Sequence, residues 1–406
     1  MPVQFTGSLR PNEIFGAIYN MIISQQVFAN PLKHNYNLVD EFRVDGGMYG
    51  DTKLYYSTDV LASNNWGADT VAGNLLQTHR PASPKCQKIT LTNFRQIPLT
   101  TDQYLSKRAW STEGAFSSFN SVMLGWMGDT KKLYDSTLFN VYLGTTESSI
   151  GKQTQNVDID QYASVSDVEA KNRLEAQEIA RHIANTLDEL KDYSRDYNDY
   201  KFMRSYDPSE LLVIWNTKYI NKITKLDLPT MFHEVGIDKF EERKLPYRFF
   251  GTKITAANIS NFSAAGGAAN KPINSTNNTY APGDNHANGT LRSAIEQDIT
   301  VSGVKYHLFP GDELPVGATV KSDNLTTTYE VNGTGSNKVV VDNFYIEVSD
   351  IICKIIHKDS IPFMSGFETG TSFFNPQALL ENHYTTWGYS DLDYLQEFPF
   401  ITLHAD

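Results

Sequence analysis

Residues 110–144, WSTEGAFSSFNSVMLGWMGDTKKLYDSTLFNVYLG, decide how the rest of the chain is organised. Apolar side chains recur there every three or four positions, which is the period of a helix with one buried face. At about 1.5 Å per residue this helix is roughly 50 Å long, about three times the usual length. This helix is either a long core helix of a large α+β protein or a spine to which other segments attach. Its expected buried residues are Phe116, Phe119, Val122, Met123, Trp126, Met127, Leu133, Tyr134, Leu138, Val141 and Tyr142.

The sequence also marks the ends and the polar face of this helix. Ser111 or Thr112 can cap its start, and Gly144 can close its end. Gly125 and Gly128 each weaken the helix by roughly 1 kcal/mol relative to alanine, so packing must hold it, with a bend expected near these glycines. The face expected in solvent carries Asp129, Lys131, Lys132 and Asp135.

Two extended segments precede the spine and enclose a polar tip. Residues 38–60 and 85–99 favour strands, whereas residues 61–85 are rich in Asn, Ala, Gly and Pro. We therefore predict two long strands that lead directly into the spine. A two-stranded hairpin is marginal alone in water and leaves unpaired edges. It either lies on another copy of the protein or belongs to the sheet of its own domain.

Further elements are predicted on both sides of this unit. A helical arm is expected over residues 12–28, before Pro31. A second amphipathic helix is expected over 166–193, with Asp167 near its cap and Val168 in its apolar stripe. The remaining expectations are a buried strand at 211–215, a helix at 217–233 and extended chain at 244–255.

The composition changes in the last third of the chain. Residues 256–290 are dominated by Asn, Ala, Gly, Ser and Thr and cannot build a core, so an exposed insertion is expected. A small β-rich piece at 295–345 and a core strand at 350–357 follow. The tail from residue 373 is aromatic, and Pro399 places the final strand at a sheet edge.

Composition limits the class of function. The chain has 406 residues and a formal net charge of −12, which disfavours a DNA reader that neutralises phosphates but suits a container. No apolar run approaches the ~20 residues of a membrane span, and residues 1–13 lack the features of a secretory signal. Cys86 and Cys353 are far apart in the sequence, which favours a reduced compartment and packing roles.

A search for catalytic or binding motifs nominates no catalytic, cofactor-binding or metal-ligating residue. His233-Glu234 begins like a zinc-protease helix, but Ile237 stands where the second histidine is needed. Residues 333–335 lack the third glycine of a dinucleotide fingerprint. Asp158 and Asp160 lack the remaining ligands of a calcium loop. An enzyme assembled from distant residues stays open at this point.

The order of elements resembles the major capsid proteins of tailed double-stranded DNA phages, which have the α+β Hong Kong 97-like fold. The likeness is greatest to the short-tailed, phi29-like group (podoviruses). It is carried by Asn30-Pro31-Leu32-Lys33, by residues 85–142 and by residues 341–363. The resemblance implies an N-terminal arm (1–40), an E-loop hairpin (41–105), a peripheral domain with the spine (106–160), an axial domain (161–254), an exposed insertion (255–340) and returning strands with the C-terminal segment (341–406).

The resemblance implies a structural protein that self-assembles into an icosahedral shell around the phage genome. Its partners would be its own copies in pentamers and hexamers, a portal protein, a scaffold protein and non-specifically contacted double-stranded DNA, without a membrane. Such a protein is a virion component assembled in the bacterial cytoplasm. The alternatives are a tail or fibre protein and a soluble hydrolytic enzyme. Candidate assembly residues are Trp110, Phe116, Trp126, Gly125, Gly128, Lys107, Arg108 and Trp387.

Overall fold

The computed structural model describes residues 37–46, 50–63, 80–102, 113–223, 241–255, 258, 263–264, 273–274, 279–280, 290–301, 304–315, 320–322, 328–331, 338–340, 343–348 and 350–406. Side chains of the long helix are described from residue 122 onward. The predicted arm at 12–28, most of the predicted tip and the predicted helix beyond residue 223 lie outside these residues.

The predicted spine is confirmed as one unbroken helix, α3 (Glu113–Thr145). It passes through Gly125 and Gly128, and the caps proposed at Ser111 and Thr112 lie outside the described residues. The second predicted helix is α4 (Val168–Lys191), and the Asp167 side chain accepts a hydrogen bond from the Glu169 N–H as expected. The other helical pieces are α5 (Thr217–Ile223), η1 (Leu38–Phe42), η3 (Asp160–Tyr162), η4 (Pro208–Glu210) and η5 (Tyr247–Phe249).

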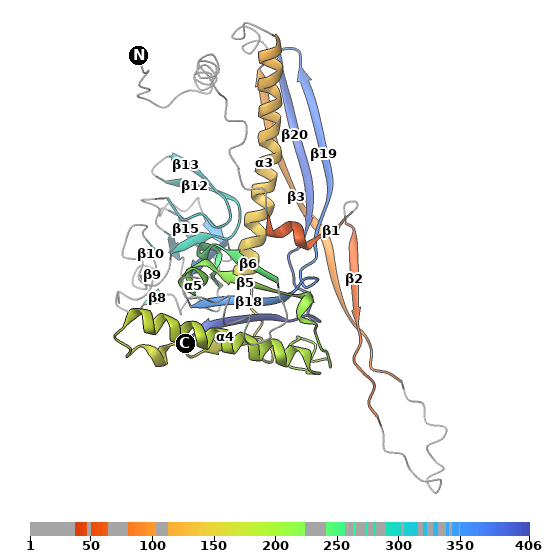
Figure 1. Ribbon diagram of the computed structural model, residues 1–406. Helices are drawn as coiled ribbons and strands as arrows, with labels where there is room; N and C mark the ends of the chain where they lie inside the picture. Colours follow the sequence, from red (N-terminus) through yellow and green to blue (C-terminus); the bar gives the residue numbers. More distant parts are fainter. Residues whose placement is uncertain are drawn as a thin grey trace.

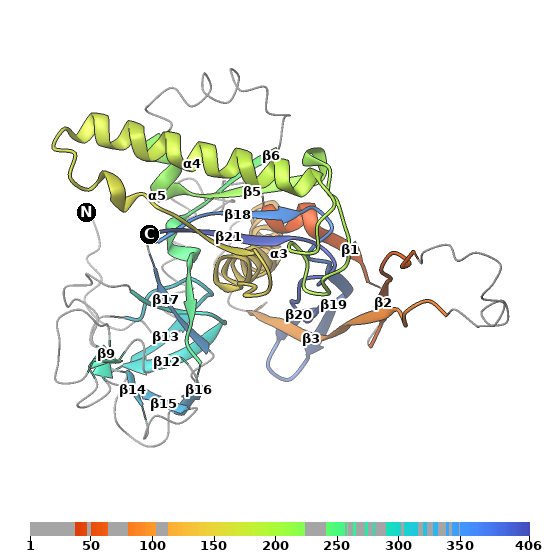
Figure 2. The same cartoon turned by 90° about the horizontal axis from the view of Figure 1, so that it is seen from below.

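A central five-stranded sheet lies between α4 and the end of α3 (Figures 1 and 2). Its order is β4 (Thr154–Val157), β21 (Phe400–Ala405), β18 (Ile351–His357), β5 (Leu211–Asn216) and β6 (Glu241–Leu245). Strand β5 is fully buried because its side chains point alternately to the two faces of the sheet and both faces are covered. Leu211, Val213 and Trp215 pack with α4, whereas Leu212 and Ile214 pack with the last turns of α3.

A second five-stranded sheet runs beside α3 (Figure 1). Its order is β1 (Arg43–Asp45), β19 (Phe363–Asn375), β20 (Leu380–Ser390), β3 (Lys85–Asp102) and β2 (Thr52–Ser57). Tyr134 of α3 contacts Trp387 and Tyr389 of β20, with ring centroids 5.9 and 5.7 Å apart. The sheet and the helix therefore form one elongated unit.

The predicted hairpin exists, but its two strands differ in length. Strand β3 has 18 residues, whereas β2 has only six. Residues 85–90 of β3 pair with β2, and residues 91–102 pair with β20. The hairpin therefore belongs to the sheet of its own subunit along β20 and projects from the body along β2 (Figure 1).

The β-rich piece consists of short strands grouped on the side of the central sheet away from α4 (Figure 2). One sheet contains β11 (Leu291–Ser293), β17 (Phe344–Glu347) and β7 (Gly251–Lys253). Strands β12 (Gln297–Val301) and β13 (Val304–Leu308) form a hairpin. The last sheet contains β16 (Lys338–Val340), β15 (Thr328–Val331), β14 (Val320–Ser322), β10 (Thr279–Tyr280), β9 (Ile273–Asn274) and β8 (Ser263–Ala264).

Four local predictions are wrong. Strand β21 is not at an edge, because β4 pairs with its outer side while Pro399 precedes the strand. Asp135 is buried, because Arg43 reaches its carboxylate from β1. Val168 is exposed, because it stands at the very start of α4. Gly144 does not close α3 but lies within its last turn, against the backbone of Phe249.

Candidate functional site

The outer face of the hairpin exposes large apolar side chains. Leu54 is 50% exposed and Tyr56 64%, and both point to the same side because they are two positions apart in β2. Val60 and Leu61, just beyond the strand, are also exposed. Within the described residues nothing covers this row. A contiguous exposed apolar surface on a projecting element is typical of a protein-binding site.

A second exposed apolar surface lies on β19 and its connection to β20. Phe367, Phe373, Phe374 and Leu379 are exposed there. Strand β1 pairs with β19 only over residues 363–365, so in the described part of the chain the rest of its outer edge has no strand partner. The two edges of this sheet, β2 and β19, are thus both available for pairing with another chain.

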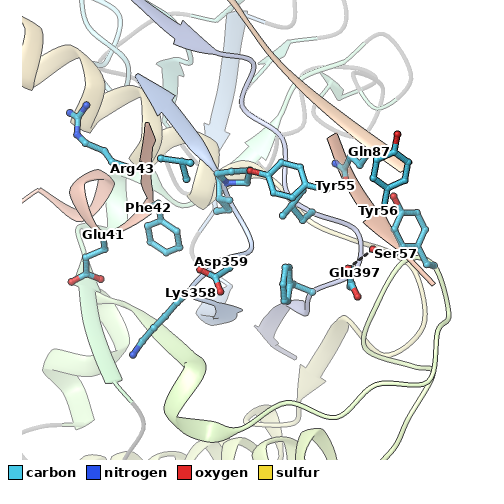
Figure 3. A pocket seen from close by; sticks show the side chains of 16 residues that line it. Glu41, Phe42, Arg43, Tyr55, Tyr56, Ser57, Gln87, Lys358, Asp359 and Glu397 are labelled. Atoms are coloured by element: carbon cyan, nitrogen blue, oxygen red, sulfur yellow. Dashed lines mark hydrogen bonds between the residues drawn. The ribbon is translucent and has the colours of Figure 1, made fainter. Parts of the chain in front are cut away.

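A cavity of about 390 Å³ separates the base of the hairpin from the body (Figure 3). Tyr55, Tyr56 and Gln87 border it from the hairpin, while Phe42 and Asp359 lie on the opposite side. Burial raises the pKa of Tyr55, and the negative charge of Asp359 adds to this effect. Among its lining residues the Ser57 hydroxyl donates to Glu397, which Arg204 also binds, so this pair joins the hairpin to the body.

Polar side chains that are hydrogen-bonded to one another pack along α3. Arg95 of β3 donates to the Tyr134 hydroxyl at 3.2 Å and lies over its ring, 4.8 Å from the centroid. The Asp135 carboxylate accepts from Arg43 at 3.1 Å, and burial raises its pKa more than the Arg43 charge lowers it. These contacts tie both β1 and β3 to the middle of the spine.

A charged cluster, in which Lys354 alone is buried, lies where α3 ends against the central sheet. Lys354 of β18 is fully buried and donates to the Thr146 carbonyl at 2.5 Å. Burial lowers its pKa to about 8, although the charge of Glu147 opposes this shift. His404 lies between Asp350 and Glu147, at 3.3 and 3.4 Å. Burial lowers the pKa of His404, but the two carboxylates outweigh it and raise that pKa to about 9.

Only some of the predicted assembly residues lie in the part of the chain that the structure describes. Gly125 and Gly128 are exposed on α3, and Trp126 between them is half-buried. Trp387 is buried, so it acts on assembly only through the fold of its own subunit. Phe116 lies in α3 without a described side chain. The remaining predicted residues, which lie outside the described ones, are Lys107, Arg108 and Trp110.

Sequence reasoning missed the charged cluster around Lys354 and the exposed row of the hairpin. Lys354 interrupts the apolar run 351–356, IICKII, and a lone lysine there was a readable sign of a buried cation. Leu54 and Tyr56 alternate with Lys53 and Tyr55, which by itself does not tell which face is covered. No local pattern brings His404 to Glu147, because the two are distant in the sequence.

Other site types find little support in the described part of the chain. Its residues contain no group of three or more His, Cys, Asp or Glu side chains placed to hold a metal ion. Cys86 is exposed and Cys353 is buried, and both are free thiols. None of the described helices combines the length and the apolar character needed to cross a membrane.

Comparison with known proteins identifies the fold. No family model and no curated protein matches the sequence. A chain in the capsid structure of Staphylococcus phage Andhra is 9% identical, with a TM-score of 0.57 over 94% of this chain and 87% of that one. A chain in the structure of the head fibre and inner core protein gp22 of native bacteriophage P68 is 10% identical, with a TM-score of 0.53 over 94% and 88%. The predicted α+β fold of a phage capsid protein is therefore confirmed.

Proposed function

We propose that this protein is the major capsid protein of a tailed double-stranded DNA phage. The observation that carries the proposal is the similarity to a chain of a phage capsid structure over 94% of this sequence. The exposed face of the hairpin supports it, since a subunit that assembles must present surface that its copies cover. The acidic net charge suits a wall that encloses nucleic acid without gripping it.

The proposal assigns a role to each part of the chain. Residues 41–105 would be the E-loop, residues 106–160 the peripheral domain, and residues 161–254 with the strands returning after residue 340 the axial domain. The segment 255–340 would be an insertion exposed on the particle. We further propose the short-tailed, phi29-like relationship, a portal and a scaffold partner, and assembly in the bacterial cytoplasm.

Electron microscopy of the purified protein tests this function. We expect closed shells, tubes or rings under assembly conditions, because many weak repeated interfaces add up in a closed particle. Fibres without any shell would favour the tail or fibre alternative. Persistent monomers under all conditions would contradict a capsid role.

The double substitution Leu54→Asp, Tyr56→Asp is expected to abolish assembly while the subunit stays folded. Both side chains are mostly exposed, so the free energy of unfolding should change by less than about 0.5 kcal/mol. The carboxylates would have to be desolvated in any interface that covers β2, which costs far more. Sedimentation velocity measures the assembled fraction, and chemical denaturation measures the stability.

Thr52→Asp is the matched control for this double variant. Thr52 stands on the same strand and face but is polar and exposed, so it tests charge without loss of apolar surface. With one carboxylate in place of two, and with Leu54 and Tyr56 kept, it should assemble less well than the parent protein but better than the double variant. If the double variant assembles as well as the parent protein, the outer face of β2 is not an assembly surface.

A further inference from the structure

The hairpin is attached to the body at its two ends and, between them, through Gln87 of β3, whose side chain donates to Asp393 and to the Tyr394 carbonyl and accepts from the Gln396 N–H. The first end is the point at which β3 exchanges one partner strand for the other. Its pairing passes from β2 to β20 between residues 90 and 91, and the register of β20 shifts between Tyr389 and Ser390. Asp391 holds this irregularity, since its Oδ1 accepts from Thr92 at 2.9 Å and from Asn93 at 2.7 Å. Such bulges bend and twist a strand, so this attachment is a natural pivot.

The second attachment lies at the end of β2. Arg204 donates through Nε and Nη2 to one oxygen of Glu397, at 3.0 and 2.8 Å, and Nη2 also donates to the Thr58 carbonyl at 2.6 Å. The other Glu397 oxygen accepts from the Ser57 hydroxyl. Asp59 accepts from the Met203 N–H at 3.0 Å and pairs with Arg195.

The loop that receives the hairpin is itself firmly built. Ser194 and Arg204 exchange backbone hydrogen bonds of 2.9 and 3.0 Å and so close the neck of the loop. Inside it, the Asn198 side chain donates to the Phe202 carbonyl at 2.7 Å and accepts from its N–H at 2.8 Å. This frame holds Lys201 in the left-handed region, at a φ of 55°. Arg195 and Arg204 therefore stand on a preorganised support.

Between the two attachments the hairpin spans the cavity of about 390 Å³ (Figure 3). Tyr55 and Gln87 border this space, and the bond between Ser57 and Glu397 lies at its margin. From Leu91 to Lys85 the strand covers roughly 20 Å at about 3.3 Å per residue. The Gln87 bonds hold the middle of this lever, and the fastening at its far end limits the rotation about the bulge that they still allow.

We propose that Arg204, Glu397 and Asp59 form a latch that sets the angle between the hairpin and the body. These are positioning residues: they need not touch a neighbouring subunit, but they fix where the exposed row of β2 meets one. The inference rests on the proposed function for its consequence, the curvature of the shell. The latch itself is a property of the single subunit and can be measured there.

The low pKa of Asp59 supports a persistent latch. The Met203 N–H and then the Arg195 guanidinium lower the pKa of this carboxyl to about 2. Asp59 thus stays ionised in the pH range where cells and virions exist. Arg204 donates hydrogen bonds from two of its nitrogens to one carboxylate, an arrangement that a lysine cannot reproduce.

Pulsed electron paramagnetic resonance on unassembled full-length subunits tests the latch. One spin label replaces Leu61, at the far end of the hairpin, and the other replaces Val168, at the opposite end of α4 from the latch. Both side chains are exposed, and α4 alone spans about 36 Å, which suits the method. Cys86→Ser removes the exposed native thiol, whereas Cys353 is buried and stays unlabelled.

Arg204→Ala is expected to widen the distance distribution about twofold, because a rotation of about 10° moves the end of a 20 Å lever by roughly 3 Å. Glu397→Gln, a milder change that keeps the size of the side chain, should widen it less. The matched control is Arg181→Ala, which removes an exposed arginine whose ion pair among the described residues is with Glu178 on its own helix. It should leave the distribution as narrow as in the parent.

The outcomes separate this inference from the proposed function. The latch would be overturned if the distance distribution were equally narrow in all four proteins, even if shells form normally. These proteins are the parent, Arg204→Ala, Glu397→Gln and Arg181→Ala. A widened distribution together with shells of varied diameter in electron micrographs of Arg204→Ala supports the latch and its effect on curvature. If the parent forms no shells, the capsid function fails, whereas the distance distribution still decides whether the latch exists.

Discussion

Replacing Gly144 with alanine is expected to lower the free energy of unfolding by about 3 kcal/mol or more. A Cβ at this position would lie 2.0 Å from the Phe249 carbonyl oxygen and 2.6 Å from its carbon, both backbone atoms. The end of α3 would have to move away from η5, and the packing of α3 on the central sheet would open. Chemical denaturation of the unassembled subunit measures the change.

Gly128→Ala provides the matched control in the same helix. Gly128 is exposed, and an added Cβ meets no atom within 4 Å. Alanine there should raise the free energy of unfolding by about 0.5–1 kcal/mol, because glycine loses more backbone freedom in a helix. Equal effects at Gly144 and Gly128 would contradict the close contact with Phe249. Backbone freedom favours alanine at both positions, so the opposite sign at Gly144 comes from its tertiary packing against Phe249.

The free energy of unfolding is expected to pass through a minimum near pH 8 to 9. The pKa of His404 is raised from 6.5 to about 9, so its stabilisation is complete below pH 6.5 and is lost as the pH rises through 9. The pKa of Lys354 is lowered from 10.5 to about 8, so the folded state loses this proton before the unfolded state does. The Lys354 contribution therefore increases above pH 8, offsets the continuing His404 loss up to pH 9, and makes the net stability rise above pH 9 as the buried charge disappears.

Two variants separate the two limbs of this profile. His404→Gln should remove the fall between pH 6.5 and 9. Lys354→Met should remove the rise, which amounts to at most about 2 kcal/mol between pH 8 and 9.5 at 1.36 kcal/mol per pKa unit. Denaturation curves should stop near pH 9.5, because burial also raises the pKa of tyrosines such as Tyr206 and Tyr345, whose ionisation on unfolding lowers stability above that pH.

Two substitutions of Lys354 separate the contribution of its packing to stability from the contribution of its charge. Lys354→Met keeps the volume and removes a buried cation, so at pH 7 it should be neutral or stabilising despite the lost bond to Thr146. Lys354→Ala leaves a cavity and should cost about 2–5 kcal/mol. A pH profile of the methionine variant that matches the parent would show that Lys354 does not titrate in this range.

Much of the architecture could be predicted because it is encoded in local periodicity. The three-to-four spacing of apolar residues gave α3 and α4 to within a few residues, and the continuous apolar run gave β5. The order of these elements then indicated the capsid fold. Predictions that depended on a single residue fared worse: Pro399 pointed to an edge strand, yet β4 pairs outside β21.

The sequence by itself determined the spine, the helix that covers the central sheet, the buried strands and the existence of a projecting hairpin. Only the tertiary structure decided that Asp135 is buried, that Gly144 touches a backbone, and that Arg204 meets Glu397 at the base of the hairpin. The physical reason is the distance along the sequence between the residues that interact. Periodicity reports which face of one element avoids water, whereas an ion pair between residues 193 positions apart exists only once the chain path brings them together.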